Sequence, residues 1–455
     1  MASSTNTPRN PKITIAVDIG SVKTCAAFQI TDHHGTRLPR HAVGFQNPMF
    51  PSAYGHPEIP ATILRTSTGY VFGFEANIIH LYRPTEAIMF PNIKHCLTGT
   101  TCAPTTRLQD CFDKVNQRWG VREDIIHIFA DLFKFIIWAI EMDITNFPAH
   151  KEMFQAWPFK DVEKEFIITY PLERNIALRL SMMQGALDAG CCRVRMLTDL
   201  FAASRRVAKF EKTKNPWTCV VLDCGDLTTS ATVIHVTRGE DGEVDRVRQI
   251  GSPESLLAGN KSINDYAMVE IRKNPAIQDK LDTLNWEHIA YMFSRAKRHQ
   301  KKLFDDGTHL LNMGNPACPN VTLTERDMII FTLPIVDATV KLALKQYSAA
   351  VKEGFTPSDL VLCGGPTFND QFRNMVFTIF KSRVKIQHDH DIEFVALYDN
   401  AYIPHGALLH AEDLLRDAAA ATTEPATTEP ATTEPDTTEP DTTEPDTGNA
   451  AQTEP

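Results

Sequence analysis

The chain has 455 residues, of which 43% are hydrophobic, and this length allows two or three domains with substantial cores. Its net charge is −10, but residues 417–455 hold ten of the 56 acidic residues and none of the 46 basic ones. The rest of the chain is therefore close to neutral, which argues against a nucleic-acid-binding protein.

Two features bear on the cell compartment. The N-terminal segment MASSTNTPRNPK lacks the apolar run of a targeting sequence, and the longest apolar stretch, residues 125–140, is interrupted by Asp131 and Lys134. The ten cysteines contain no CxxC pair, a pattern typical of reduced thiols rather than of zinc sites. We expect a cytoplasmic protein without membrane segments.

The first half of the chain alternates strands and helices. Two strands, KITIAVDIG (12–20) and TCAAFQIT (24–31), flank a tight turn and predict a hairpin. The pattern then predicts a helix at 122–143, a strand at 165–171, a helix at 175–190, a strand at 194–199 and a helix at 200–210.

The second half begins in the same way. WTCVVLDCG (217–225) and TSATVIHV (229–236) are two apolar runs about a turn and predict another hairpin. Each half of the chain thus opens with an apolar strand that ends in Asp-x-Gly. This likeness indicates an internal duplication. Further elements are expected as helices at 264–272, 285–304 and 325–352, a strand at 359–365, a helix from about residue 370 and a polar edge strand at 387–394.

The C-terminal residues 417–455 repeat a five-residue unit, TTEPA or TTEPD. The unit has no apolar face and a proline in every copy, so burial cannot offset the entropy of ordering it. We expect a disordered acidic tail, either a solvated spacer or a stalk that binds a partner or is modified.

Three short runs carry candidate chemistry: VDIGSVKTCAAF (17–28), LDCGDLTTSATV (222–233) and LVLCGGPTFND (360–370). In the first two, an aspartate follows a buried strand just before a glycine turn. Such carboxylates can hold hydrated Mg²⁺ while the turn approaches phosphate oxygens. In the third, adjacent glycines let the backbone pass close to a flat ligand such as a base and ribose.

The order and spacing of these runs resemble the actin, sugar-kinase and heat-shock ATPase superfamily, and most of all the nucleotide-binding domain of the seventy-kilodalton heat-shock chaperones. The runs correspond to that family's first phosphate, second phosphate and adenosine motifs. Pro171 matches the family's inter-lobe hinge proline, and Arg179 follows at the family's spacing. MLTDLFAAS and IPHGALLHA fall where the family has its connecting helices, and SRAKRHQKK (294–302) retains the core of the helix that packs against adenosine.

The resemblance covers residues 11–412 and implies an α/β chain with the two-lobed actin-like ATPase fold, built from duplicated, ribonuclease-H-like lobes with mixed sheets. Lobe I is expected at 11–210 with an outer subdomain at about 43–115. Lobe II is expected at 216–412 with an outer subdomain at about 238–325. ATP or ADP with Mg²⁺ would lie between the lobes. Only the repeat tail follows, so we expect no peptide-binding domain.

The resemblance also assigns roles to individual residues. Thr228 matches a threonine that places the attacking water, and Asp199 stands where the family has a catalytic-site glutamate. The implied catalytic residues are Asp18, Asp199, Asp223 and Thr228, and Asp18 and Asp223 would hold Mg²⁺ through water. The implied nucleotide-binding residues are Gly20, Ser21, Val22, Lys23, Gly225, Asp226, Lys297, Arg298, Gly364 and Gly365.

Several positions depart from the family pattern. Asn77 stands where the family has a phosphate-contacting lysine, and Lys23 is the candidate substitute. The loss of such a lysine predicts slow or absent hydrolysis, because it meets charge that develops in the transition state. Four other family residues, an Asp, a Glu, a Ser and an Arg, are replaced by Ser230, Ser294, Pro366 and Phe368.

The second phosphate turn departs most, because Asp226-Leu227 replaces a pair of glycines. A carboxylate about 5 Å from a phosphate charge costs roughly 3 kcal/mol per unit charge at an effective dielectric near 20. Unless Asp226 lies away from the phosphate or binds Mg²⁺, it opposes ATP. Leu227 adds a side chain where a glycine allows close backbone approach.

Three functions follow as hypotheses. The first is a divergent heat-shock-ATPase-like protein that binds Mg-ATP or Mg-ADP, hydrolyses it weakly or not at all, and regulates a protein partner. The second is a scaffold that keeps the fold without nucleotide. The third is a small-molecule kinase, for which Asp199 is the candidate base.

Overall fold

The computed structural model describes residues 10–45, 56–94, 102–146, 154, 158–172, 176–298, 308–315, 318–397 and 401–423. Met1–Glu412 forms one compact unit and Asp413–Pro455 a second. The chain has an α/β fold with mixed sheets, which confirms the predicted class. None of the described helices is long and apolar enough to cross a membrane.

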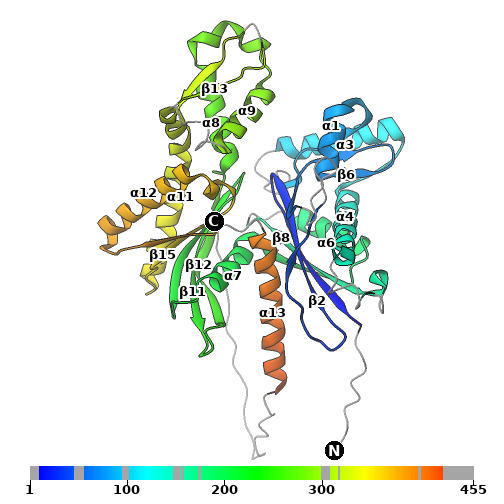
Figure 1. Cartoon of the computed structure of the whole chain (residues 1–455), viewed down its shortest axis with the longest axis vertical. Coiled ribbons are helices and arrows are strands. Elements are labelled where there is room, and N and C mark those ends of the chain that lie inside the picture. Colours follow the sequence, from blue (N-terminus) through cyan, green and yellow to red (C-terminus); the bar gives the residue numbers. More distant parts are fainter. Residues whose placement is uncertain are drawn as a thin grey trace, which may run out of the picture. The chain divides into compact units, whose positions relative to one another are not determined.

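The first large sheet has the strand order β3-β2-β1-β8-β9, and β4 also pairs with β2. β1 and β2 are antiparallel, as predicted, whereas β8 runs parallel to β1 and β9 parallel to β8. The bounds are β1 Lys12–Ile19, β2 Lys23–Thr31, β3 His41–Ala42, β4 Glu58–Pro60, β8 Glu163–Tyr170 and β9 Arg193–Thr198 (Figure 1).

The helices of this half are α1 Gly73–Tyr82, α3 Cys102–Trp119, α4 Ile125–Asn146, α6 Ile176–Asp188 and α7 Asp199–Phe210. A small sheet of order β6-β5-β7 comprises β5 Ile63–Arg65, β6 Tyr70–Phe72 and β7 Ile88–Met89, and short 3-10 helices lie at Pro84–Glu86 and Phe159–Asp161. The small sheet, α1 and most of α3 fall within the segment 43–115 that was predicted as an outer subdomain.

The second large sheet has the order β12-β11-β10-β15-β16, with β10 antiparallel to β11 and parallel to β15. β11 and β12 are antiparallel and β15 and β16 parallel, so both large sheets share one order and one set of directions. The bounds are β10 Trp217–Cys224, β11 Thr229–Arg238, β12 Val244–Leu256, β15 Asp359–Cys363 and β16 Glu393–Ala396.

The remaining elements of this half are α8 Asn260–Arg272, α9 Trp286–Arg298, α11 Glu325–Lys352, α12 Asp370–His388 and α13 Tyr402–Thr423. β13 Thr308–Leu311 pairs with β14 Val321–Thr324, and 3-10 helices lie at Pro275–Thr283 and Gly365–Phe368. Helix α13 continues past residue 417, where the tail was predicted to begin, and the disorder predicted for 424–455 lies outside the described residues.

Alternation along the strands builds helix layers on both faces of each sheet. In β1, Ile13 and Ile15 belong to the core shared with α4 and α6, whereas Ala16 belongs to the core shared with α7 and α13. In β10, Leu222 packs with α8, α11 and α12, whereas Val221 packs with α7 and α13. Helices α7 and α13 therefore contribute to a core that contains residues of both large sheets.

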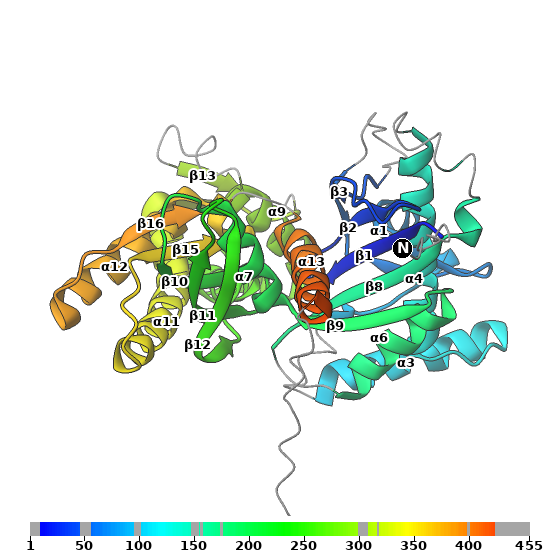
Figure 2. The ribbon, with the colours of Figure 1, turned by 90° about the horizontal axis from the view of Figure 1, so that it is seen from below.

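Helices α7 and α13 lie side by side (Figure 2). A Cβ atom on Gly406 would lie 1.8 Å from the carbonyl oxygen of Ala202, so only glycine permits this crossing. Both helices follow a strand at the edge of their own sheet, α7 after β9 and α13 after β16.

One predicted element is wrong. Residues 387–394 were expected as an edge strand, but helix α12 continues to His388 and ends at Asp389, whose φ of 53° is left-handed. The helix is carried this far by buried residues at near-helical spacing: Phe372, Val376, Phe380 and Val384. Only the last part of the segment forms a strand, β16.

Asp143 on α4 gives a prediction for stability. Burial raises the pKa of its carboxyl to about 6, although a hydrogen bond from the N–H of Gly44 opposes this. Since the folded pKa exceeds the unfolded one, the stabilisation is present below pH ~4 and is lost as the pH rises through about 6. Asp143→Asn should remove up to about 3 kcal/mol of this pH dependence in urea unfolding.

The control for this measurement is Asp131→Asn, an exposed carboxylate on the same helix that pairs with Lys134. It should leave the dependence of unfolding free energy on pH unchanged. A wild-type curve that is flat between pH ~4 and ~6 would contradict the prediction.

Candidate functional site

The two predicted phosphate turns are closed by the same type of hydrogen bond. In the first, the N–H of Gly20 donates to the carbonyl of Lys23 at 2.9 Å, and in the second the N–H of Gly225 donates to the carbonyl of Thr228 at 2.8 Å. A Cβ atom on Gly20 would lie 2.4 Å from that acceptor oxygen, and one on Gly225 would lie 3.0 Å from its own. The first turn therefore depends on its glycine, and the second leaves little room for a side chain at Gly225.

The strands before these turns bring their aspartates to a cluster of buried charged groups. Asp18, near the end of β1, accepts a hydrogen bond from the hydroxyl of Thr169 at 3.2 Å. Asp223, near the end of β10, accepts one from the phenol of Tyr402 at 2.6 Å. Their charges influence each other, because Asp18 helps to raise the pKa of Asp223.

Asp199 is the third carboxylate of the cluster and the first residue of α7. Thr198 caps this helix, so the carboxylate lies at its N-terminus, where the helix dipole favours negative charge. Tyr402 is likewise the first residue of α13. Helices α7 and α13 thus both begin at the carboxylate cluster.

Lys94 supplies positive charge to this cluster, and sequence reasoning missed it. Its Nζ lies 3.2 Å from Oδ2 of Asp199 and 4.0 Å from Oδ1 of Asp18, and its side chain is 10% exposed. It stands in PNIKHC, outside every motif, and more than 70 residues from both partners. An isolated lysine in a short segment carries no sequence signal that distinguishes it from a surface lysine.

The surroundings shift the pKa values of these groups. Burial, helped by the charge of Asp199, raises the pKa of Asp223 to about 7, against the opposing effects of the hydrogen bond from Tyr402 and the charge of Lys94. Burial also raises the pKa of Asp199 against the effect of Lys94. Burial alone would lower the pKa of Lys94, but Asp199, Asp18 and Asp223 raise it above its usual range.

The segment that carries Lys94 is attached to the first phosphate turn. Nδ2 of Asn92 donates to the carbonyl of Ser21, and the N–H of Lys94 donates to Oδ1 of Asn92 at 2.9 Å. The neighbouring N–H of Ala61 donates to the carbonyl of Val22, whose side chain is exposed. The first turn is therefore held from one side by the segment that also places the lysine.

Lys23 and Asn77 do not join this cluster through any contact that the structure shows. The ammonium of Lys23 forms an ion pair with Glu58 on β4, the strand that pairs with its own strand. The carboxamide of Asn77 accepts a hydrogen bond from the exposed hydroxyl of Thr62 at 2.7 Å. Lys94 thus meets the carboxylates where Lys23 had been expected to act.

Asp226 is directed at the start of α8. Its Oδ1 accepts a hydrogen bond from Nδ2 of Asn260 at 3.2 Å, and its carbonyl accepts one from the N–H of Lys261 at 2.7 Å. A Cβ on Gly259 would lie 2.2 Å from the same carbonyl oxygen, so the turn packs closely on this helix. Of the second turn's other polar residues, Thr228 is buried and Ser230 donates to Ser255 at 3.0 Å.

Lys297 also contacts α8. Its ammonium donates to the carbonyl of Asn260 at 3.0 Å and to Oδ1 of Asn264 at 2.5 Å, and the residue is only 5% exposed. In this arrangement it joins α9 to α8, and little of its stem is open to a base. The side chains of Arg298 and Phe368 lie outside the described residues.

The two glycines of the third run differ. Gly364 has a φ of 97°, and a Cβ there would lie 2.1 Å from the carbonyl oxygen of Cys224 and 3.1 Å from Oδ1 of Asp223. Gly365 has open space around its Cα. Gly364 therefore brings the third run against the second phosphate turn.

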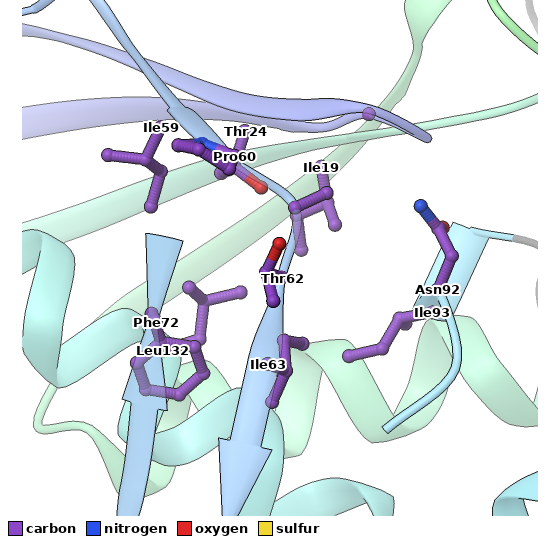
Figure 3. Close-up of a pocket in the computed structure, with 12 residues that line it drawn as sticks. Ile19, Thr24, Ile59, Pro60, Thr62, Ile63, Phe72, Asn92, Ile93 and Leu132 are labelled. Atoms are coloured by element: carbon purple, nitrogen blue, oxygen red, sulfur yellow. The ribbon is translucent and has the colours of Figure 1, made fainter. Parts of the chain in front are cut away.

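A small cavity lies beside the first turn (Figure 3). Its volume of about 10 Å³ has room for about one water molecule and none for a nucleotide. The lining includes Ile19, Gly20, Thr24, Ile59, Ile63, Phe72, Asn92 and Ile93.

The charged cluster as placed does not fit a magnesium ion. Across the described part of the chain, no three acidic, histidine or cysteine side chains converge so as to hold a metal ion. Asp18 and Asp223, the predicted ligands, are instead accompanied by Lys94 and by the hydroxyls of Thr169 and Tyr402. The positive charge that this site contains is an ammonium.

Comparison with known proteins assigns no family to the chain. No family model matches the sequence, and no curated protein gives a significant match.

Proposed function

We propose that this chain is a divergent, actin-like, two-lobed ATPase-superfamily protein of the heat-shock type that binds ATP or ADP between the two phosphate turns. The observation that carries the proposal is the pair of matched turns, each closed by the same Gly N–H to carbonyl hydrogen bond at the end of equivalent strands. Unrelated turns would not be expected at equivalent positions in two sheets with the same strand order, so the match supports a duplicated phosphate motif.

Hydrolysis is proposed to be weak or absent, and the bound state to regulate a protein partner. Asp199, the candidate for activating water, is paired with Lys94 and has a raised pKa because it is buried. A carboxylate whose charge is paired with an ammonium removes protons poorly. The same pairing argues against a small-molecule kinase, because Asp199 was the candidate base of that hypothesis. ATP consumption stimulated by a sugar or polyol would instead support the kinase.

Isothermal titration of the full chain with ATP and with ADP, in the presence of magnesium chloride, tests nucleotide binding. We expect saturable heat and a rise in melting temperature with either nucleotide. Neither heat nor a thermal shift at millimolar nucleotide would refute the proposal.

The second phosphate turn supplies a sharper prediction. The double variant Asp226→Gly, Leu227→Gly removes the negative charge of the second phosphate turn and restores close backbone approach, so ATP should bind about 10- to 100-fold more tightly than to the wild type. Asp265→Asn, a carboxylate on α8 that pairs with Lys261, is the matched control and should leave the affinity unchanged.

A nucleotide-free scaffold is the second candidate function. It is favoured by the internal neutralisation of the carboxylates by Lys94 and by the presence of Asp226 in the second turn. This candidate requires that the wild type bind no nucleotide while the double-glycine variant does. Nucleotide binding by the wild type would eliminate it.

A further inference from the structure

Lys94 contacts the largely buried carboxylates of Asp18 and Asp199, and the charges of these two reach a third buried carboxylate, Asp223. These neighbouring carboxylates need a counter-charge. The side chains of Asp18 and Asp199 are 14% and 4% exposed, and Asp223 is buried as well. Like charges that are removed from water destabilise one another unless an opposite charge pairs with them. A divalent metal ion is one solution, and a lysine is another.

Lys94 is placed to be that cation. Its ammonium lies within 4.0 Å of both Asp18 and Asp199, and its backbone is held by Asn92, which also binds the carbonyl of Ser21 in the first turn. The ammonium is therefore fixed beside both the carboxylates and the turn where phosphate oxygens would bind. No metal-holding group of side chains occurs among the residues that the structure describes.

We propose that Lys94 is a built-in counter-cation that takes the place of a divalent metal ion, so that nucleotide binding at this site does not depend on Mg²⁺. The metal-independence of nucleotide binding rests on the function proposed above. The replacement of a metal by the lysine does not, because it concerns the carboxylates alone. An ammonium with three N–H donors can pair with two carboxylates and still donate to a phosphate oxygen.

The first experiment measures the affinity of the wild type for ATP by calorimetry, once with excess magnesium chloride and once with EDTA. We expect dissociation constants that agree within about threefold. Binding that is weaker by about tenfold or more in EDTA would overturn the proposal.

The second experiment needs no nucleotide. Free Mn²⁺ is followed by electron paramagnetic resonance during titration into the wild type, Lys94→Ala and the control Lys23→Ala, whose lysine pairs with Glu58 instead. We expect stoichiometric Mn²⁺ binding by Lys94→Ala only, together with a rise in its melting temperature on addition of Mn²⁺. Mn²⁺ binding by the wild type, or none by folded Lys94→Ala, would refute the replacement of a metal by Lys94.

The two experiments fail in different ways. A wild type that binds no nucleotide with or without Mg²⁺ refutes the proposed function, while the manganese titration still decides the role of Lys94. If Lys94→Ala does not fold, the double variant Lys94→Ala, Asp199→Asn replaces it. This variant lacks the negative charge that Lys94 neutralises, so it should fold more readily, and it keeps the other two carboxylates. It should bind Mn²⁺ more tightly than the wild type does, and equal binding would refute the proposal.

Discussion

Replacement of Lys94 by methionine is expected to lower the free energy of unfolding by about 3–5 kcal/mol, since it leaves buried carboxylates without their cation. Lys94 lies 3.2 Å from Asp199 and both side chains are buried, so solvent cannot compensate. Asp199→Asn in the same chain removes one of the unpaired charges. The double variant should therefore be more stable than Lys94→Met alone.

Urea unfolding of the two single variants and the double variant, analysed as a double-mutant cycle, measures this coupling. The matched control is the exposed pair Lys134 and Asp131 on α4, for which coupling should be below about 0.5 kcal/mol. A loss of less than about 1 kcal/mol in Lys94→Met would show that the cluster does not depend on the lysine.

Replacement of Gly364 by alanine is expected to destabilise the protein by roughly 3–5 kcal/mol and to abolish nucleotide binding. Its φ of 97° disfavours any residue with a Cβ, and that Cβ would lie 2.1 Å from the carbonyl oxygen of Cys224. The clash forces the third run away from Asp223 and from the second phosphate turn.

The neighbouring glycine is the control. Gly365→Ala meets nothing within 4 Å and has no left-handed backbone, so its effect on the unfolding free energy should stay below about 1 kcal/mol. Melting temperatures and ATP titrations of the two variants test the difference. Equal behaviour of the two alanine variants would contradict the close approach at Gly364.

The inner strands of both large sheets follow from local pattern, whereas some edge strands and outer segments do not. The strands β1 and β10 and the glycines of their turns were predictable because a short apolar run and Asp-x-Gly are local signals. Helix α3 and strand β12 were not, since both are long but carry many polar residues. The prediction of a strand at 387–394 was wrong, because the buried residues on one face of helix α12 extend the helix to His388.

The candidate site shows the same division. Asp18, Asp199 and Asp223 were identified from motifs, and the structure brings them into one electrostatically coupled cluster. Lys297 was expected against a nucleoside, but its ammonium contacts α8. Its neighbours on α8 lie more than 30 residues away in sequence, and a basic residue has no local feature that reveals its acceptor.

By itself, the sequence determined where the central strands and the two glycine turns lie and which aspartates precede the turns. Backbone freedom and strand burial are properties of short segments. Only the tertiary structure decided which charge meets these aspartates. Lys94 reaches Asp199 across 105 residues of chain, and the pKa of Asp223 rises to about 7 because it is buried and lies near the charge of Asp199. Desolvation and charge pairing depend on distance in space, which no local pattern contains.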